Sequence, residues 1–123
     1  MAFLADTVFD DGLSQIAALA ENLYITSAEA TTFTEASSTV KLGTKAAPSI
    51  GSPADKTGGG REVTVASISD GTVDATGTAT HWALTDDSAS LLVATGSLSS
   101  SQSVTSGNTF TLAAFTVGIS DPL

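Results

Sequence analysis

The chain lacks cysteine altogether and is poor in aromatic side chains, with five Phe, one Tyr and one Trp among 123 residues. Without cysteine there are no disulfides and no thiolate metal sites. Apolar residues make up 41% of the chain, and many of them are small alanines, so a thin core is expected. The length suits a single domain spanning residues 1–123.

Basic residues are equally scarce, since 4 bases stand against 13 acids and the formal net charge is −9. A nucleic-acid partner is not expected, because phosphates are neutralised by clusters of Lys and Arg. All the bases fall in one segment: Lys41, Lys45, Lys56 and Arg61. This clustering predicts that the segment contacts an acidic surface on a partner protein.

Long apolar runs are missing as well, so no membrane-spanning helix is expected. The start, "MAFLADTVFDD", has no basic leader and reaches acidic residues early, unlike a secretory signal. We therefore expect a soluble protein made in the cytoplasm.

The first element is predicted to be an amphipathic helix of about fifteen residues within region 1–23. Apolar residues recur at steps of three or four from Phe9 through Leu13 and Ile16. Asp6 or Thr7 is predicted to cap the helix, with Asp10 completing a capping box.

Region 24–60 is predicted to contain a short strand, 23–26, followed by an irregular excursion and a long loop. Phe33 is expected to anchor the excursion. The loop, "TKAAPSIGSPADKTGGGR", is rich in Gly and Pro, and loops of this length are often functional. Its triple glycine lacks the Gly-Lys-Ser/Thr ending of a phosphate-binding loop.

Region 61–123 alternates apolar and polar residues and is predicted to form antiparallel strands. "REVTVASI" is a strand, and Ser69–Thr72 is predicted to be a hairpin turn because Asp-Gly favours positive φ. A long strand is expected over 73–85, an acidic loop over 86–90, and a returning strand over 91–98. Next comes a polar connection over 99–108, with a turn at 106–108. The last strand is expected over 109–119. The expected fold is mainly β (α+β): a sandwich or small barrel with one N-terminal amphipathic helix and a long Gly/Pro loop.

His81 and Trp82, each the single residue of its type, are neighbours in the long strand. Alternation predicts that Trp82 and Leu84 face the core, and that His81 shares the opposite face with Ala79 and Val73. No nucleophile-elbow or oxyanion pattern accompanies His81, so an enzyme is not expected. One His cannot build a multi-His metal centre, and the acidic loop lacks a calcium-loop pattern, so no metal or cofactor is predicted.

Several stretches, among them "ADTVFDDGL", "SPADKTGGGREVTV", "GTATHWAL" and "LLVATGSLSSSQSVTSGNTFTL", together resemble a family of small virion structural proteins of tailed bacteriophages. The resemblance spans nearly the whole chain and implies a multi-copy, non-enzymatic virion component. It carries no functional residues.

We therefore expect a capsid decoration (cement) protein that binds the major capsid protein or another virion protein, as a homo-oligomer. A tail or head–tail component, or a receptor- or glycan-binding virion module, is the alternative. The predicted partner contacts are Phe33, Lys41, Lys45, Lys56, Arg61 and the two termini.

Overall fold

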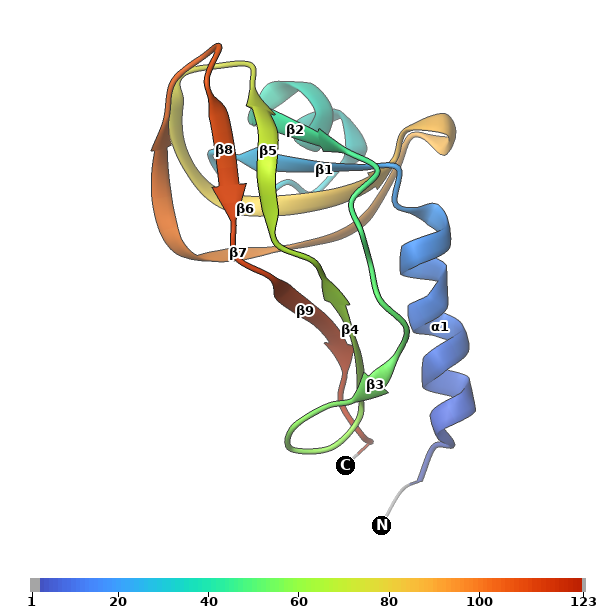
Figure 1. The fold of residues 1–123 in the computed structure, drawn as a ribbon. Helices are drawn as coiled ribbons and strands as arrows, with labels where there is room; N and C mark the ends of the chain where they lie inside the picture. The colour runs from blue at the N-terminus through green and yellow to red at the C-terminus, as the bar shows by residue number, and fades with distance from the viewer. Residues whose placement is uncertain (1–2, 123) are drawn as a thin grey trace.

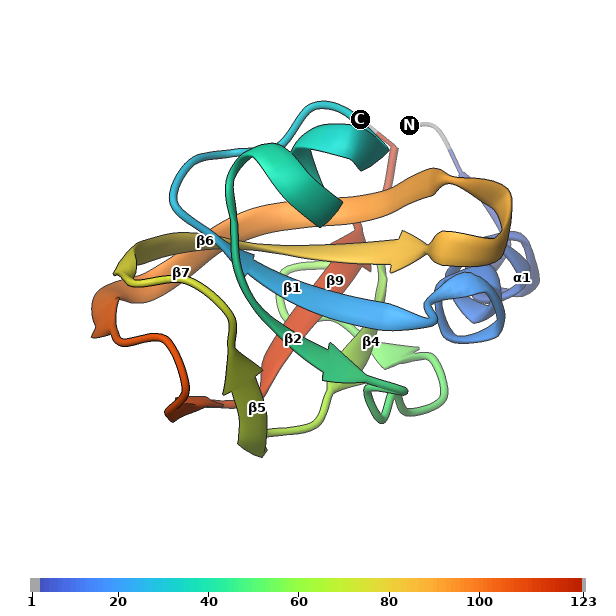
Figure 2. The ribbon, with the colours of Figure 1, turned by 90° about the horizontal axis from the view of Figure 1, so that it is seen from above.

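A computed structural model describes residues 3–122 and confirms the expected fold class: mainly β, with one N-terminal helix. Within these residues, the larger sheet has six antiparallel strands in the order β7-β6-β1-β2-β5-β8. This sheet curls into a half-barrel (Figures 1 and 2). Its strands in chain order are β1 (Asn22–Thr26), β2 (Lys41–Ala46), β5 (Ile68–Val73), β6 (Gly77–Asp86), β7 (Leu91–Val104) and β8 (Thr109–Leu112).

A smaller sheet extends from the half-barrel and lies beside the helix (Figure 1). It comprises β3 (Ala54–Asp55), β4 (Arg61–Val65) and β9 (Phe115–Ile119). Paired β4 and β9 continue the paired β5 and β8, with short breaks at 66–67 and 113–114. The predicted single last strand over 109–119 is therefore wrong, because the chain changes sheets at Ala113–Ala114.

Helix α1 (Asp6–Leu19) agrees with the apolar periodicity, since Phe9 and Leu13 are buried. The predicted cap is wrong: Ala5 occupies the N-cap position, and no side chain caps the helix. Asp10, expected in a capping box, instead reaches Arg61 on β4. The carboxylate thus makes a tertiary contact in place of a local one.

The main core fills the half-barrel. Its fully buried members include Leu23 and Ile25 of β1, which places the short strand expected over 23–26 at the centre of the sheet. Trp82 is 6% exposed and packs in this core, so its predicted burial is confirmed. A smaller cluster lies on the outer face, where a π-helical turn (Glu35–Thr39) covers β1 and β6 (Figure 2).

Three other predicted boundaries are wrong. Residues 69–72 are not a turn but part of β5, and residues 99–104 are not a connection but the second half of β7. The long loop is shorter than expected, because β2 extends to Ala46 and β3 pairs with β4. The turn at 106–108 is confirmed, with Gly107 at φ 90°.

The faces of β6 also differ from the prediction. Ala79 belongs to the same core as Trp82 and Leu84, although alternation assigned it to the opposite face. Val73, assigned to the same face as Ala79, is not in β6 at all but ends β5, and it also lies in this core. The pairing of β6 with β7 shifts register between Ala79 and His81, at the point where the alternation of β6 changes face.

Candidate functional site

A cavity of about 350 Å³ lies between the two edge strands of the half-barrel. Its floor is aromatic: the rings of Trp82 and Phe115 are 4.4 Å apart at their centroids and tilted by 32°. The indole also lies against the backbone of Gly96, where an added Cβ would be 2.6 Å from Cζ2. The wall is formed by residues 97–100, Gln102 and 111–114.

Because Trp82 is held between Gly96 and Phe115, it does not offer the exposed aromatic platform that a glycan-binding module would use. The cavity wall carries hydroxyl, carboxamide and apolar groups and no charged side chain. Its chemistry suits a neutral, partly apolar group.

His81 is half-buried on β6, opposite Thr26 of β1 and Ser97 of β7. Its Nδ1 lies 2.8 Å from the Thr80 hydroxyl. Among residues 3–122, no carboxylate is hydrogen-bonded to this ring, so the geometry does not assemble a Ser–His–Asp triad around it.

Two of the predicted contact residues, Lys41 and Lys45, lie on β2 and form ion pairs within the chain. Lys41 Nζ is 3.1 Å from Asp74, and Lys45 Nζ is 3.1 Å from Asp70. The Lys41 ammonium also lies 5.3 Å from the centroid of the Tyr24 ring. These pairs are partly exposed and contribute little to stability.

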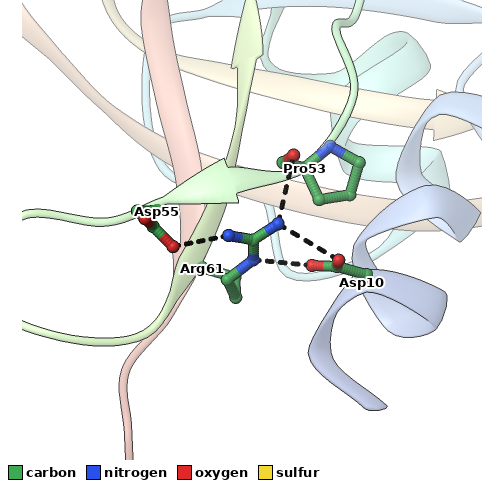
Figure 3. A network of polar contacts seen from close by, with 4 residues as sticks. All are labelled: Asp10, Pro53, Asp55 and Arg61. Carbon is green, nitrogen blue, oxygen red and sulfur yellow. Dashed lines mark hydrogen bonds and ion pairs between the residues drawn. The ribbon is translucent and has the colours of Figure 1, made fainter. Parts of the chain in front are cut away.

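Arg61 is the centre of a polar network that joins three elements (Figure 3). Its Nε and Nη2 donate to both carboxylate oxygens of Asp10 on α1, at 2.8 and 3.1 Å. Nη1 donates to Asp55 on β3, and Nη2 also donates to the carbonyl of Pro53 at 3.4 Å. The hydrogen bonds to Asp10 and then Asp55 raise the pKa of Arg61 above its usual value.

This bidentate pairing fixes α1 against the small sheet, a role that the sequence alone did not reveal. Since the guanidinium is occupied within the chain, Arg61 is a poor candidate for contacting a partner.

Lys56 differs from the other three bases, because in the described part of the chain it forms no ion pair. Its stem lies over Gly118 of β9, where a Cβ would be 3.0 Å from Lys56 Cδ. The bases therefore fall into two pairs in different sheets, with Lys41 and Lys45 on β2 and with Lys56 and Arg61 in the β3–β4 hairpin. Phe33, another predicted contact, is half-buried just before the π-helical turn. Of the two termini predicted as contacts, residues 1–2 and 123 lie outside the described residues.

An acidic corner forms where α1 meets the turn after β6. Asp87 accepts hydrogen bonds from Tyr24 Oη and Thr85 Oγ1, both at 2.6 Å. Burial would raise the pKa of Asp87, but hydrogen bonds from Thr85, Tyr24 and Asn22 outweigh it and hold the pKa below its usual value. Burial and then the bond to Asp87 raise the pKa of Tyr24 to about 12.

The carboxyl groups of Glu21 and Asp86 face each other in the same corner, where a proton on Asp86 can be hydrogen-bonded to Glu21. This bond raises the pKa of Asp86 and lowers that of Glu21. The backbone N–H of Ser88 also donates to Glu21, at 2.8 Å. Within residues 3–122, no group of three or more acidic or His side chains is placed to hold a metal ion.

The most exposed large apolar side chains gather around α1 and the end of β9. Phe3 is 86% exposed, Val8 55% and Ile119 40%. A Cβ added at Gly12 would lie 3.9 Å from Ile119 Cδ1, so this face of α1 points toward Ile119. Val8 is one helical turn before Gly12 and shares its face, so Val8 and Ile119 lie on the same side of the molecule. We call Phe3, Leu4, Val8 and Ile119 the apolar end. The only hint of it in the sequence is the run of apolar residues before Asp6.

None of the helices in the described residues is long and apolar enough to cross a membrane. No protein-family model, no curated protein and no solved structure matches this chain. The resemblance to phage virion proteins therefore rests on the sequence stretches alone.

Proposed function

We propose that this chain is a non-enzymatic structural subunit of a tailed-bacteriophage virion, most directly a decoration protein bound in many copies to the outside of the capsid. The observation that carries the proposal is the apolar end. Its side chains are exposed in the single chain, although each would contribute roughly 1.5–3 kcal/mol if fully buried.

Large exposed apolar patches on soluble proteins mark contact sites. Among residues 3–122, four of the five exposed large apolar residues belong to the apolar end, and only Leu91 lies elsewhere, at the start of β7. Lys56 lies over Gly118 on the other face of the small sheet, because Gly118 and Ile119 are successive residues of β9 and point to opposite faces. The apolar end suits contact with another protein, and Lys56, which forms no ion pair in the described residues, suits an acidic surface such as that of a shell subunit.

The rest of the surface is acidic, because the chain carries a net charge of −9. Like charge keeps free copies apart and soluble. Apolar contacts then provide the attraction at the shell, and many copies bridge neighbouring subunits without covalent chemistry.

Mass spectrometry of separated heads and tails from purified virions tests the proposal. We expect the chain in the head fraction. Its presence in tails alone would favour the tail or head–tail alternative, and its absence from virions would refute the proposal.

Rebinding to particles stripped of the native chain tests the contact surface. We expect Val8→Ser and Ile119→Ser to reduce occupancy, whereas Leu91→Ser should not, since it is similarly exposed but lies outside the apolar end. Lys56→Gln should reduce the salt dependence of binding, and Lys45→Gln, already paired with Asp70, should not. Equal occupancy for Val8→Ser and Leu91→Ser would contradict the assigned surface.

A further inference from the structure

The larger sheet does not close into a barrel. Its two edge strands are β7 and β8, and no strand within residues 3–122 pairs with their outer edges. Instead, the Gln102 side chain crosses the gap, and its Nε2 donates to the carbonyl of Thr111 at 2.7 Å. The Gln102 side chain thus provides the Thr111 carbonyl with the hydrogen bond that a backbone N–H of a neighbouring strand would otherwise donate.

One side chain, Gln102, spans the gap, and an inserted strand would displace it and lie about 4.8 Å from each of its two partners. Unpaired edge strands are templates for such addition, in which backbone hydrogen bonds give affinity and pockets receive alternate side chains. The cavity floored by Trp82 and Phe115 is such a pocket, since it lies between residues 97–102 and 111–115.

The groove is also uncharged along its described wall. Two copies of a chain with net charge −9 repel each other over most of their surfaces. Contact between copies is therefore least opposed where neither surface carries charge.

Residues 3–5 meet the requirements of the occupant. They carry no charged side chain, Ala5 is extended (φ −64°, ψ 142°), and Phe3 is the most exposed large apolar residue described. The start of α1 lies at the opposite end of the molecule from β8, so the segment does not reach the groove of its own chain (Figure 1).

We infer that the groove between β7 and β8 receives residues 3–5 of a second copy, which add as a strand while the Phe3 side chain enters the cavity. The contact is head-to-tail, so repeating it gives a ring or an open chain of subunits. This inference uses one part of the apolar end and leaves Val8 and Ile119 free, and it does not depend on a virion.

Concentration series of the full chain test the inference by sedimentation and by Trp82 fluorescence. Trp82 is the single Trp and lines the cavity, so its emission reports on groove occupancy. We expect association and the change in emission to share one midpoint. Phe3→Ser should move that midpoint to a roughly 10- to 100-fold higher concentration, because it removes the burial of one large apolar side chain.

A second variant changes the groove itself instead of the segment that enters it. Ala114 is exposed in the cavity wall, so Ala114→Glu adds a charge there without disturbing the core, and it should weaken association at least tenfold. The matched controls are Val8→Ser, which removes an exposed apolar residue outside residues 3–5, and Ala28→Glu, which adds a charge at an exposed alanine outside the cavity lining. Both should keep the parent midpoint.

The inference is overturned if the parent stays monomeric up to about 1 mM, the limit of weak association. It is equally overturned if association leaves Trp82 emission unchanged, or if Phe3→Ser associates like the parent. None of these results affects the proposed function, which is tested by shell binding of Val8→Ser and Ile119→Ser.

Discussion

Adding one methyl group at Gly71 should destabilise the fold, because Gly71 on β5 lies directly opposite Phe110 on β8. A Cβ at Gly71 would lie 2.2 Å from Phe110 Cε1 and 2.3 Å from Cζ. Carbon atoms in contact prefer about 3.5–4.0 Å, so the ring would have to move by more than about 1 Å. The ring cannot move freely, since Phe110 is 2% exposed and also lies close to Gly43 of β2.

Two limits bound the size of this effect. Overpacking a core costs about 1–3 kcal/mol, and losing a buried Phe altogether costs about 3–5 kcal/mol. We therefore expect Gly71→Ala to lower the free energy of unfolding by about 2–4 kcal/mol. Urea unfolding followed by Trp82 fluorescence measures it, because Trp82 is the single Trp and is buried in the core.

A double-mutant cycle with Phe110→Leu separates this clash from a general intolerance of alanine at position 71. Leu is smaller than the ring, so Gly71→Ala should cost at least 1 kcal/mol less in that background. An equal cost in both backgrounds, or a Gly71→Ala protein within about 0.5 kcal/mol of the parent, would refute the reasoning.

Three further outcomes follow from the same structure. Gly12→Ala should stabilise the protein by about 0.5–1 kcal/mol, because Gly12 lies inside α1 and its nearest neighbour would be 3.9 Å from the new Cβ; a lower urea midpoint would contradict this. The single Tyr, Tyr24, should ionise near pH 12 in an absorbance titration, and Asp87→Asn should lower that midpoint while leaving part of the shift, since burial is the larger cause. Asp86→Asn should stabilise the protein more at pH 7 than at pH 3. A carboxyl group whose pKa is raised in the folded state disfavours folding once the pH exceeds the pKa of the unfolded state. Equal gains in stability at both pH values would show that Asp86 does not titrate in this way.

The sequence predicted the parts of the fold whose signals are local. The spacing of Phe9 and Leu13 predicted the buried face of α1, and the alternation of apolar and polar residues in β4 agrees with the burial of Val63 and Val65. The turn around Gly107 needs a positive φ, which glycine adopts without steric cost. Each of these features depends on residues only a few positions apart.

Distant contacts were not predictable in the same way. Asp70–Gly71 has the composition of a hairpin turn, yet Gly71 lies in a strand because a ring from β8 covers its backbone. Asp10 likewise looked like a helix cap, but its partner Arg61 is 51 positions away. In both cases the residue type fits two roles, and a distant neighbour selects one.

The bulge between β6 and β7 shows how one such error propagates to the candidate site. Between two paired positions, β6 advances from Ala79 to His81 while β7 advances from Ser97 to Gln102. The extra residues of β7 fall in a serine-rich run, which has too few apolar side chains to fix the pairing register from sequence. The same residues form one wall of the cavity between β7 and β8. The irregularity that coincides with the change of faces in β6 therefore also lies in the wall of the groove.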